Sequence, residues 1–258
     1  MGIIVCVVSL GFFAFYPCAK EGGSITRRVS IILPSYNERE NLTVLIPKIF
    51  DVMRRLRAYT TEIIVVDDDS PDHTASAIQK RFGKRVRVIV RKRVRGLATA
   101  IRTGIAHSHG DIIVGMDADG NHNPISIPSL LRALSVSDLV VGSRFIHGGG
   151  MHDRVRYIAS WLFNAVLRYV LLFPVWDNTS GYYVIRKKTL FQMKPDRIYQ
   201  GYGDYHLRLV YAAKTLGFRV REVPVFYEDR RYGQSKSRLF IMAVSYLRTA
   251  INLCFDKR

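Results

Sequence analysis

The sequence predicts an α/β fold in which helices flank a mostly parallel β-sheet. Short apolar, β-branched runs recur between residues 29 and 142, segments with helical spacing of apolar residues separate them, and two of the runs end in clustered carboxylates. Strands that alternate with helices form right-handed βαβ units and therefore pair in parallel. The length of 258 residues suits one domain with short appendages.

The alternation holds from the first predicted strand onward. Residues 29–34 form a short apolar, β-branched run, which is typical of a buried strand, and residues 41–57 repeat leucine, isoleucine and methionine at helical spacing. Further strands are expected at residues 62–67, 86–90, 111–116 and 138–142, and further helices at residues 74–82, 97–107 and 124–134. In such sheets ligands bind at the carboxyl ends of the strands.

Two apolar segments in the second half differ from these helices. Residues 158–176 contain Arg168 as their only charge, and residues 239–255 contain only Arg248. Each segment can be an amphipathic membrane-interface helix whose basic residue meets lipid headgroups, or an ordinary buried helix. Neither is a clean membrane-spanning segment.

The charge balance predicts an anionic partner. Lys and Arg number 39 against 21 Asp and Glu, a formal net charge of +18. Nucleic acid, a membrane surface and a phosphorylated substrate all fit such a charge. The basic residues are dispersed and no recognition motif accompanies them, so we expect no nucleic-acid partner. Cys6, Cys18 and Cys254 form neither a disulfide framework nor a metal cluster.

The N-terminal segment is an apolar leader, expected at residues 1–27. Residues 3–19 carry no charge and lie at the short end of what a spanning helix needs. Positive charges follow the run at Lys20, Arg27 and Arg28, but none precedes it. By the positive-inside rule we expect the leader to be an anchor with a cytoplasmic domain after it. The alternatives are a signal peptide, and a mispredicted start or a buried leader.

The carboxylates at two strand ends are candidate metal ligands. Asp67-Asp68-Asp69 follows one predicted strand, and Asp117 and Asp119 follow another. Alternating carboxylates at Asp117 and Asp119 can face a divalent cation, Mg²⁺ or Mn²⁺, that neutralises a diphosphate, and Asn121 can add an amide oxygen. A solvated turn with acidic caps is the alternative for an isolated Asp-x-Asp.

Further motifs surround these acids in a fixed order. They are Pro34-Ser-Tyr36-Asn37-Glu38, Val66-Asp67-Asp68, Gly142-Ser143-Arg144, Glu222-Val-Pro224 and Arg230-Arg-Tyr-Gly233-Gln-Ser-Lys236. The ordered set resembles the polyprenyl-phosphate sugar transferases of glycosyltransferase family 2, most closely the dolichyl-phosphate mannosyltransferases. The resemblance covers about residues 28 to 238.

The resemblance implies a GT-A (Rossmann-like) domain over residues 28–238, followed by an amphipathic C-terminal helix at 239–258. It implies transfer of mannose from GDP-mannose to dolichyl or another polyprenyl phosphate, with inversion at the anomeric carbon. By the same resemblance the nucleotide sugar is held by Pro34, Tyr36, Glu38, Val66, Asp68, Ala118, Asp119, Arg230 and Lys236. The metal is held by Asp117, Asp119 and Asn121, and the catalytic residues are Asp119, Arg144, Arg230 and Lys236. Another donor such as UDP-glucose, or a non-catalytic relative, is the alternative.

Some positions depart from the family pattern. Arg208 stands where an acidic residue is usual, Tyr183 where an arginine often sits, and Gln234 where glutamate is frequent. Arg154 and Arg156, which precede the apolar segment at 158–176, can reach the acceptor phosphate or form a basic loop at a membrane. The histidines lack metal-ligand spacing, so no role is predicted for them.

The expected location is a membrane surface with the catalytic domain in the cytoplasm, at the endoplasmic reticulum in a eukaryote. Attachment would use the leader, the amphipathic helices or a membrane-anchoring subunit. The glycosylation sequons at Asn41 and Asn178 both fall in segments assigned to the site. Glycans there would block the site, which favours a cytoplasmic domain.

Overall fold

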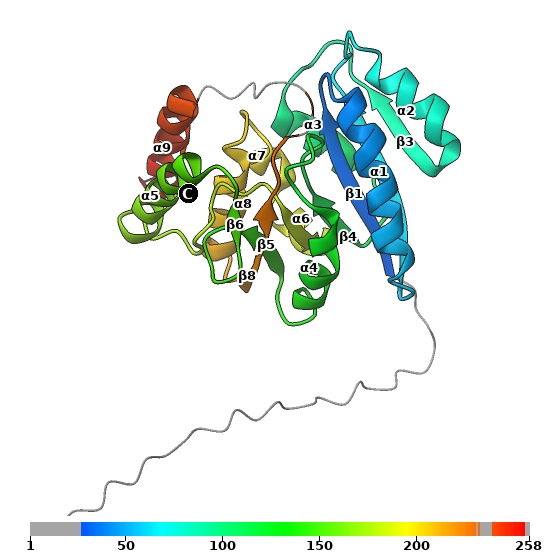
Figure 1. The fold of residues 1–258 in the computed structure, drawn as a ribbon. Coiled ribbons are helices and arrows are strands. Elements are labelled where there is room, and N and C mark those ends of the chain that lie inside the picture. Colours follow the sequence, from blue (N-terminus) through cyan, green and yellow to red (C-terminus); the bar gives the residue numbers. More distant parts are fainter. Residues whose placement is uncertain (1–26, 231, 233–238, 256–258) are drawn as a thin grey trace, which may run out of the picture.

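The computed structural model describes residues 27–230, residue 232 and residues 239–255 (Figure 1). The predicted leader up to residue 26, and the turn that carries Gln234 and Lys236, lie outside the described residues. Asn41 and Asn178, the two sequon asparagines, are both buried.

A seven-stranded sheet in the described part of the chain has the strand order β3-β2-β1-β4-β7-β5-β8. The strands are β1 Arg27–Ser35, β2 Tyr59–Asp67, β3 Val86–Val90, β4 Ile112–Gly115, β5 Leu139–Ser143, β7 Tyr183–Arg186 and β8 Val220–Pro224. All neighbours pair in parallel except β7, which is antiparallel to both β4 and β5. The predicted mostly parallel α/β sheet is confirmed, and β7 and β8 are additions to it.

A second, small sheet lies at one edge of the site. It consists of β6, Gly150–Met151, and β9, Phe226–Tyr227, which pair in parallel. An isolated bridge joins His122 to Tyr227. These pairings bring the segment after β8 against the loop after β4.

The helices agree with the predicted segments in the first half and differ in the second. They are α1 Arg39–Arg54, α2 Thr74–Phe82, α3 Leu97–Ala106, α4 Ile127–Ala133, α5 Arg154–Tyr169, α6 Lys187–Gln192, α7 Pro195–Ile198, α8 Tyr205–Thr215 and α9 Leu239–Phe255. Short 3₁₀ turns occupy Gly83–Arg85 and Pro124–Ser126.

The helix expected at 158–176 is displaced toward the N-terminus. It begins at Arg154, because the Asp153 carboxylate caps it by accepting the N–H of Arg156 over 2.9 Å. It ends at Tyr169, and Leu172 then adopts a left-handed φ of 55°. The apolar sequence continues past this end, so hydrophobicity alone extends the predicted helix too far.

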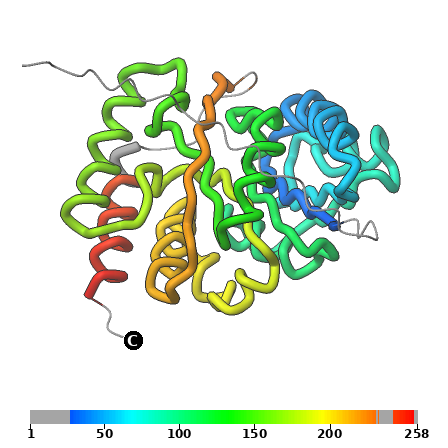
Figure 2. The backbone as a smooth tube through the Cα atoms, turned by 90° about the horizontal axis from the view of Figure 1, so that it is seen from below, coloured from blue at the N-terminus to red at the C-terminus, as the bar shows by residue number. Residues whose placement is uncertain are grey.

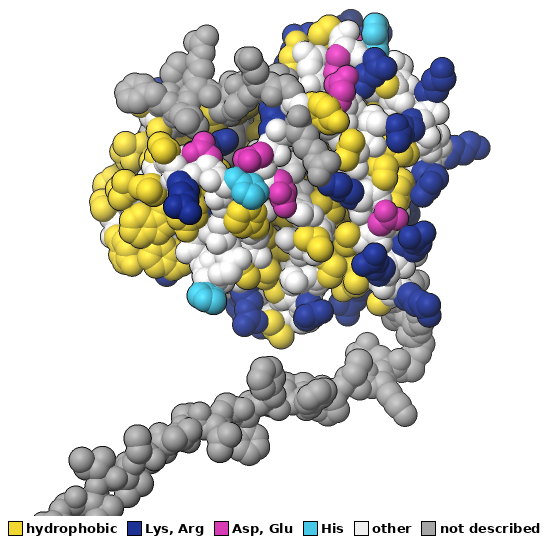
Figure 3. All heavy atoms as spheres, viewed as in Figure 1, with side chains coloured by type: hydrophobic (Ala, Val, Ile, Leu, Met, Phe, Trp, Pro, Cys, Tyr) yellow, Lys and Arg dark blue, Asp and Glu magenta, His cyan; other side chains and the backbone are white. Residues whose placement is uncertain are grey.

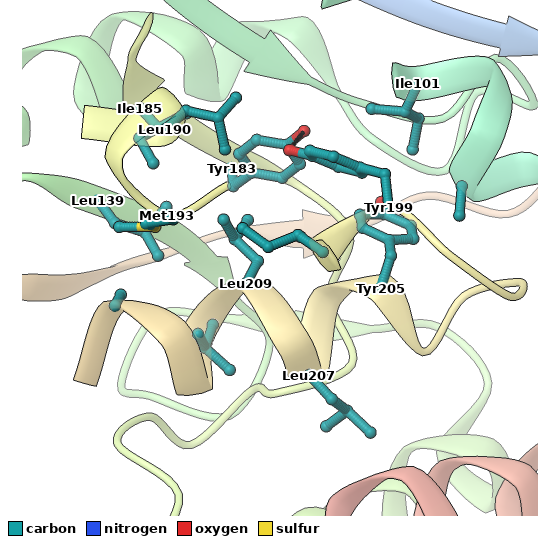
Figure 4. Packing of buried hydrophobic residues seen from close by; sticks show 14 of the residues in the cluster. Ile101, Leu139, Tyr183, Ile185, Leu190, Met193, Tyr199, Tyr205, Leu207 and Leu209 are labelled. Carbon is teal, nitrogen blue, oxygen red and sulfur yellow. Dashed lines mark hydrogen bonds between the residues drawn. The ribbon is translucent and has the colours of Figure 1, made fainter. Parts of the chain in front are cut away.

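The hydrophobic core lies on both faces of the sheet. Along β1, Ile31 and Leu33 face the helices α1 and α4, whereas Ile32 faces α3 on the opposite side. The same alternation of faces runs through β2, β5 and β7, as expected when successive side chains of a strand point in opposite directions. Figure 4 shows the second face, where Tyr183 of β7 and Tyr199 meet through their hydroxyls at 2.7 Å.

Helices α5 and α9 lie side by side at one flank of the molecule (Figure 2). Phe163 of α5 and Tyr246 of α9 are neighbours, with ring centroids 6.5 Å apart. Hydrophobic side chains gather over these two helices, whereas Lys and Arg are spread over the end that carries α1 and α2 (Figure 3). The exposed apolar residues on α5 and α9 are Val155, Ile158, Trp161, Leu162, Val166, Tyr169, Val244, Leu247, Ile251 and Phe255. Among the described helices, none combines the length and hydropathy needed to cross a membrane.

Candidate active site

A cavity of about 570 Å³ opens where β1, β2 and β4 end. Because these strands are parallel, their carboxyl ends meet at the same edge of the sheet. The predicted site residues that line the cavity are Pro34, Tyr36, Glu38, Asp68, Asp117, Ala118, Asp119, Asn121, Arg144 and Arg230. The cavity therefore brings together residues from five separate segments of the sequence.

Asp117 and Asp119 stand on the wall that follows β4. Removal from bulk solvent and the nearby Glu38 carboxylate raise the pKa of Asp117 to about 6. Burial and the Asp117 carboxylate raise the pKa of Asp119. Shielding from water is the larger cause for both carboxyl groups, and the neighbouring carboxylates add to it, so both groups are harder to ionise than an exposed aspartate.

This donor set fits a divalent cation. The Asp119 carboxylate accepts hydrogen bonds from the backbone and from Nδ2 of Asn121, each over 3.1 Å, so that the loop holds the carboxylate in place. The Asn121 amide nitrogen is used in this way, and its carbonyl oxygen is the atom that suits a hard metal ion. No group of three or more His, Cys, Asp or Glu side chains completes a metal site among the described residues. A cation bound by Asp117, Asp119 and Asn121 would take its remaining ligands from phosphate oxygens or water, which is how proteins usually hold Mg²⁺.

Glu38 and Arg230, which both line the cavity, form an ion pair. The Arg230 guanidinium bonds Oε1 of Glu38, and Nδ2 of Asn41 donates to Oε2 of the same carboxylate over 2.7 Å. Nε of Arg230 also donates to the backbone oxygen of Tyr232 over 2.9 Å. The pair fastens the end of the described C-terminal loop to the first turn of α1.

Asp68 organises the loop that precedes α3. Nε of Arg91 donates to its Oδ1 over 2.7 Å, and the backbone N–H of Gly96 donates to its Oδ2 over 2.7 Å. Arg95, which belongs to the same loop, lines the cavity, and its guanidinium lies 5.0 Å from the centre of the Tyr36 ring. Asp68 therefore shapes the part of the wall that Tyr36 and Arg95 form.

Arg144 lines the cavity and is fixed by an ion pair with Asp177. The pair is buried, with Arg144 5% and Asp177 0% exposed. Burial would lower the pKa of Arg144, but the Asp177 carboxylate outweighs it and raises that pKa above its ordinary value. In turn burial would raise the pKa of Asp177, and Arg144 holds it below its usual range. Both side chains are therefore charged, and the guanidinium keeps one orientation at the cavity.

His122 forms a buried support behind the acids. Its ring stacks on Tyr182 at 4.8 Å between centroids, and burial lowers its pKa to about 4. The neutral ring accepts the N–H of Asp117 at Nδ1 over 2.8 Å, so Nε2 carries the proton and donates to Oη of Tyr227 over 2.8 Å. The Tyr227 hydroxyl then donates to the backbone oxygen of Ser180 over 2.5 Å. The chain of hydrogen bonds fixes the backbone from which Asp117 projects.

Not every predicted site residue reaches the cavity. The Val66 side chain packs in the core, fully buried, and does not line the cavity. Arg156 lines the cavity, whereas Arg154 is exposed and does not. Lys236 lies outside the described residues.

Two departures from the family pattern have a structural explanation. Tyr183 is fully buried in the core, bonded to Tyr199, and does not line the cavity. Arg208 also stays out of the cavity wall, because Nη1 forms an ion pair with Asp204 at 2.5 Å. The charge reversal at position 208 is therefore compensated beside it and adds no cation to the cavity.

Several residues of the site were not singled out from the sequence: Arg91, Arg95, His122, Asp177 and Tyr227. Asp177 directly precedes the sequon Asn178-Thr-Ser180, and an isolated acid in a loop has no spacing signal. His122 lies among other histidines in the sequence, and its hydrogen bonds to Asp117 and Tyr227 distinguish it only in the folded structure. The pairings that define these residues join positions far apart in the chain.

The comparisons with known proteins agree with this geometry. The family model described as "Glycosyl transferase family 2" matches residues 30–193. The undecaprenyl-phosphate mannosyltransferase of Micrococcus luteus is 35% identical over 218 residues, which cover 81% of this chain and 87% of that protein. The polyprenol monophosphomannose synthase of Mycolicibacterium smegmatis is 32% identical over 220 residues, covering 82% of this chain and 81% of that protein. The dolichol-phosphate mannosyltransferase of Pyrococcus furiosus is 34% identical over 215 residues, covering 81% of this chain and 59% of that protein.

The solved structures confirm the GT-A fold. Glucosyl-3-phosphoglycerate synthase from Mycobacterium tuberculosis, in complex with phosphoglyceric acid, matches with a TM-score of 0.63 at 21% identity over 88% of this chain and 80% of that one. The same enzyme with Mn²⁺, UDP-glucose and phosphoglyceric acid also matches with a TM-score of 0.63, at 20% identity over the same shares. Fold, cavity and sequence relatives thus lead to one assignment: this chain belongs to glycosyltransferase family 2.

Proposed function

We propose that this protein transfers mannose from GDP-mannose to a polyprenyl phosphate such as dolichyl phosphate, with inversion at the anomeric carbon and with Mg²⁺ or Mn²⁺. The observation that carries the proposal is the charge arrangement of the cavity. Asp117 and Asp119 stand on one wall, and Arg144, Arg156 and Arg230 line the same cavity. The mannosyltransferase names of the relatives support the choice of sugar and acceptor.

The reaction needs little acid–base chemistry from the protein. A phosphate monoester is already anionic near neutral pH, so no strong general base is required. An oxygen of the acceptor phosphate attacks the anomeric carbon and forms a new C–O bond, while the bond to the GDP oxygen breaks and its electron pair leaves with GDP. A single displacement of this kind inverts the configuration. A bound divalent cation would neutralise the departing diphosphate.

The protein must instead hold two anions that repel each other. Arginine suits this task because its guanidinium makes paired hydrogen bonds to phosphate oxygens. Arg144 is held rigidly by Asp177, and Arg230 by Glu38, so both cations are oriented before substrate arrives. Lys236 is proposed as a further phosphate contact on the strength of its motif.

We further propose that α5 and α9 rest on the membrane from which the acceptor is drawn. Val155 is 81%, Leu162 54% and Phe255 76% exposed, which is costly in water and favourable in the headgroup region. Arg156 of α5 lines the cavity, so a phosphate at the membrane surface would meet a cation while its lipid chain stays among the acyl chains. The catalytic domain would face the cytoplasm.

A donor screen tests the proposal. Purified full-length protein is given labelled GDP-mannose, UDP-glucose or another nucleotide sugar, together with dolichyl or undecaprenyl phosphate and Mg²⁺ or Mn²⁺, and label is counted in the lipid extract. Transfer from GDP-mannose is expected, and an Asp119→Ala protein serves as the matched blank. Transfer from another donor would keep the mechanism and overturn the sugar. Failure with every donor, next to an active relative, would favour a non-catalytic protein or one that needs an anchoring subunit.

A further inference from the structure

The C-terminal helix α9 forms one side of the cavity, and the carboxylate of Asp204 fastens it there. Met242 and Tyr246 of α9 line the cavity. Thr249, further along the same helix, donates a hydrogen bond from Oγ1 to Oδ2 of Asp204 over 2.9 Å. Asp204 is 4% and Thr249 8% exposed, so water competes little for this bond.

The same carboxylate also fixes the loop between α7 and α8. Its Oδ1 accepts the backbone N–H of Tyr202 over 2.8 Å. Tyr202 lines the cavity, as do Asp117 and Asp119. One side chain therefore joins two walls of the cavity, the Tyr202 loop and α9, which are separated in the sequence by α8, β8 and β9.

Two glycines allow this close approach. A Cβ atom at Gly203 would lie 1.8 Å from Oη of Tyr246, so any other residue would force the Tyr246 side chain out of its present position. A Cβ atom at Gly201 would lie 2.5 Å from Oδ1 of Asp204, and Gly201 also has a φ of 71°. The backbone of the loop is thus shaped to receive both the tyrosine of α9 and the carboxylate.

Arg208 completes the arrangement from one turn along α8. Its Nη1 lies 2.5 Å from Oδ2 of Asp204, and its Nη2 donates to Oγ1 of Thr249 over 3.4 Å. The Arg208 side chain is 22% exposed, so the ion pair is largely shielded from solvent. A carboxylate at position 208 would repel Asp204 and release the carboxylate from both of its partners.

We infer that Asp204 is a positioning residue that sets Tyr202 and α9 against the cavity, so that the donor pocket is complete only while α9 is docked. Arg208 and Thr249 keep the Asp204 carboxylate in the orientation that serves both walls. The inference deepens the proposed function and rests on it for the identity of the donor. We call Asp204, Arg208 and Thr249 together the clamp. The inference assigns Arg208, where the sequence reverses the usual charge, to this clamp and not to the sugar-binding part of the cavity.

The test compares Thr249→Val, which removes only the hydroxyl, with Thr249→Ser, which keeps it. Arg208→Glu is the second disrupting variant, and Thr215→Val, at an exposed position of α8 outside the cavity wall, is the control. Three quantities are measured on the full-length protein: backbone hydrogen exchange of the peptide spanning residues 199–204, and KM and kcat for GDP-mannose.

Thr249→Val is expected to speed exchange in the 199–204 peptide and to raise the donor KM about fivefold, which corresponds to the loss of one hydrogen bond of about 1 kcal/mol. Thr249→Ser and Thr215→Val should match the wild type, and Arg208→Glu should exceed the effect of Thr249→Val. The inference is overturned if Thr249→Val and Arg208→Glu melt earlier while exchange in this peptide and KM stay unchanged. It is also overturned if Thr249→Ser is as impaired as Thr249→Val.

Failure of the proposed function would give a different pattern. If the wild-type protein uses none of the donors, the proposed reaction is lost, and the exchange measurement alone decides the clamp. Faster exchange at residues 199–204 in Thr249→Val, restored in Thr249→Ser, would then still support the clamp, and its absence would overturn it.

Discussion

Asp177 accepts three hydrogen bonds from Arg144: two from the guanidinium, at 2.8 Å from Nε and 2.7 Å from Nη2, and one from the backbone N–H at 3.0 Å. Thr179 adds a contact of 3.0 Å from its Oγ1 to Nη2. Because both residues are buried, these hydrogen bonds hold the guanidinium in a single orientation. The Arg144 guanidinium is therefore held in a fixed orientation at the cavity wall.

Asp177→Asn should destabilise the fold by about 3–5 kcal/mol, because removing one partner leaves the other charge buried without compensation. Chemical denaturation measures the change. The control is Asp196→Asn at an exposed ion pair with Arg102, which should cost less than about 1 kcal/mol. Equal effects of the two substitutions would contradict the buried-pair interpretation.

Asp119→Asn should reduce transfer at least about 100-fold, a loss typical of removing one electrostatic contact to charge that develops in the transition state. Chelation of divalent cations should lower transfer in the wild type to a similar degree. Label in the lipid extract measures both, and circular dichroism checks the fold. Asp51→Asn, on the exposed side of α1, is the control. Undiminished transfer in the Asp119 variant would remove the metal site from the proposal.

Ile158→Glu and Leu162→Glu should each weaken binding to anionic vesicles by more than about tenfold. Each substitution removes the favourable free energy of about 1.5–3 kcal/mol for transferring the apolar side chain out of water. Vesicle sedimentation measures the binding. Val136→Glu places the same charge at an exposed valine outside α5 and α9 and should leave binding unchanged. If all three variants bind alike, the contact lies elsewhere in the chain.

Glu62→Gln should destabilise the fold at neutral pH by about 1–3 kcal/mol and have less effect in acid. Burial would raise the pKa of Glu62, but hydrogen bonds from Ser30 and His109, with the charge of Arg28, lower it below 4.5. A carboxylate whose pKa is lowered by folding stabilises the fold above its unfolded pKa, and this contribution is lost as the pH falls through the lowered value. Urea denaturation of the wild type and the variant across this range measures the difference.

The control for this pH dependence is Glu40→Gln, at an exposed position of α1. Its effect on stability should stay below about 1 kcal/mol, since its carboxylate is exposed and acts only on the N-terminus of α1. A constant gap between wild type and Glu62→Gln at all pH values would mean that Glu62 acts through its shape and not through its charge.

The strands that are apolar runs could be predicted from the sequence, because both faces of a buried parallel strand are covered and its residues are therefore mostly apolar. It did not predict β7, whose four residues Tyr183–Arg186 follow an irregular segment, or β8, whose residues alternate only weakly in polarity. The candidate metal ligands stood out because acids cluster directly after a strand. His122 and Asp177 did not, because their roles come from burial and from partners distant in the chain.

Strand β8 is the edge strand that covers β5. The two strands are far apart in the sequence, at Leu139–Ser143 for β5 and Val220–Pro224 for β8. During synthesis the ribosome releases β1, β2, β3 and β4 early, and these can pair as soon as they emerge. The β5 edge stays open until residues 220–224 have left the exit tunnel. An exposed, apolar strand edge invites pairing with other chains, so the nascent protein is most vulnerable to aggregation in this interval. A truncation before residue 220 should therefore be the form that chaperones bind most strongly.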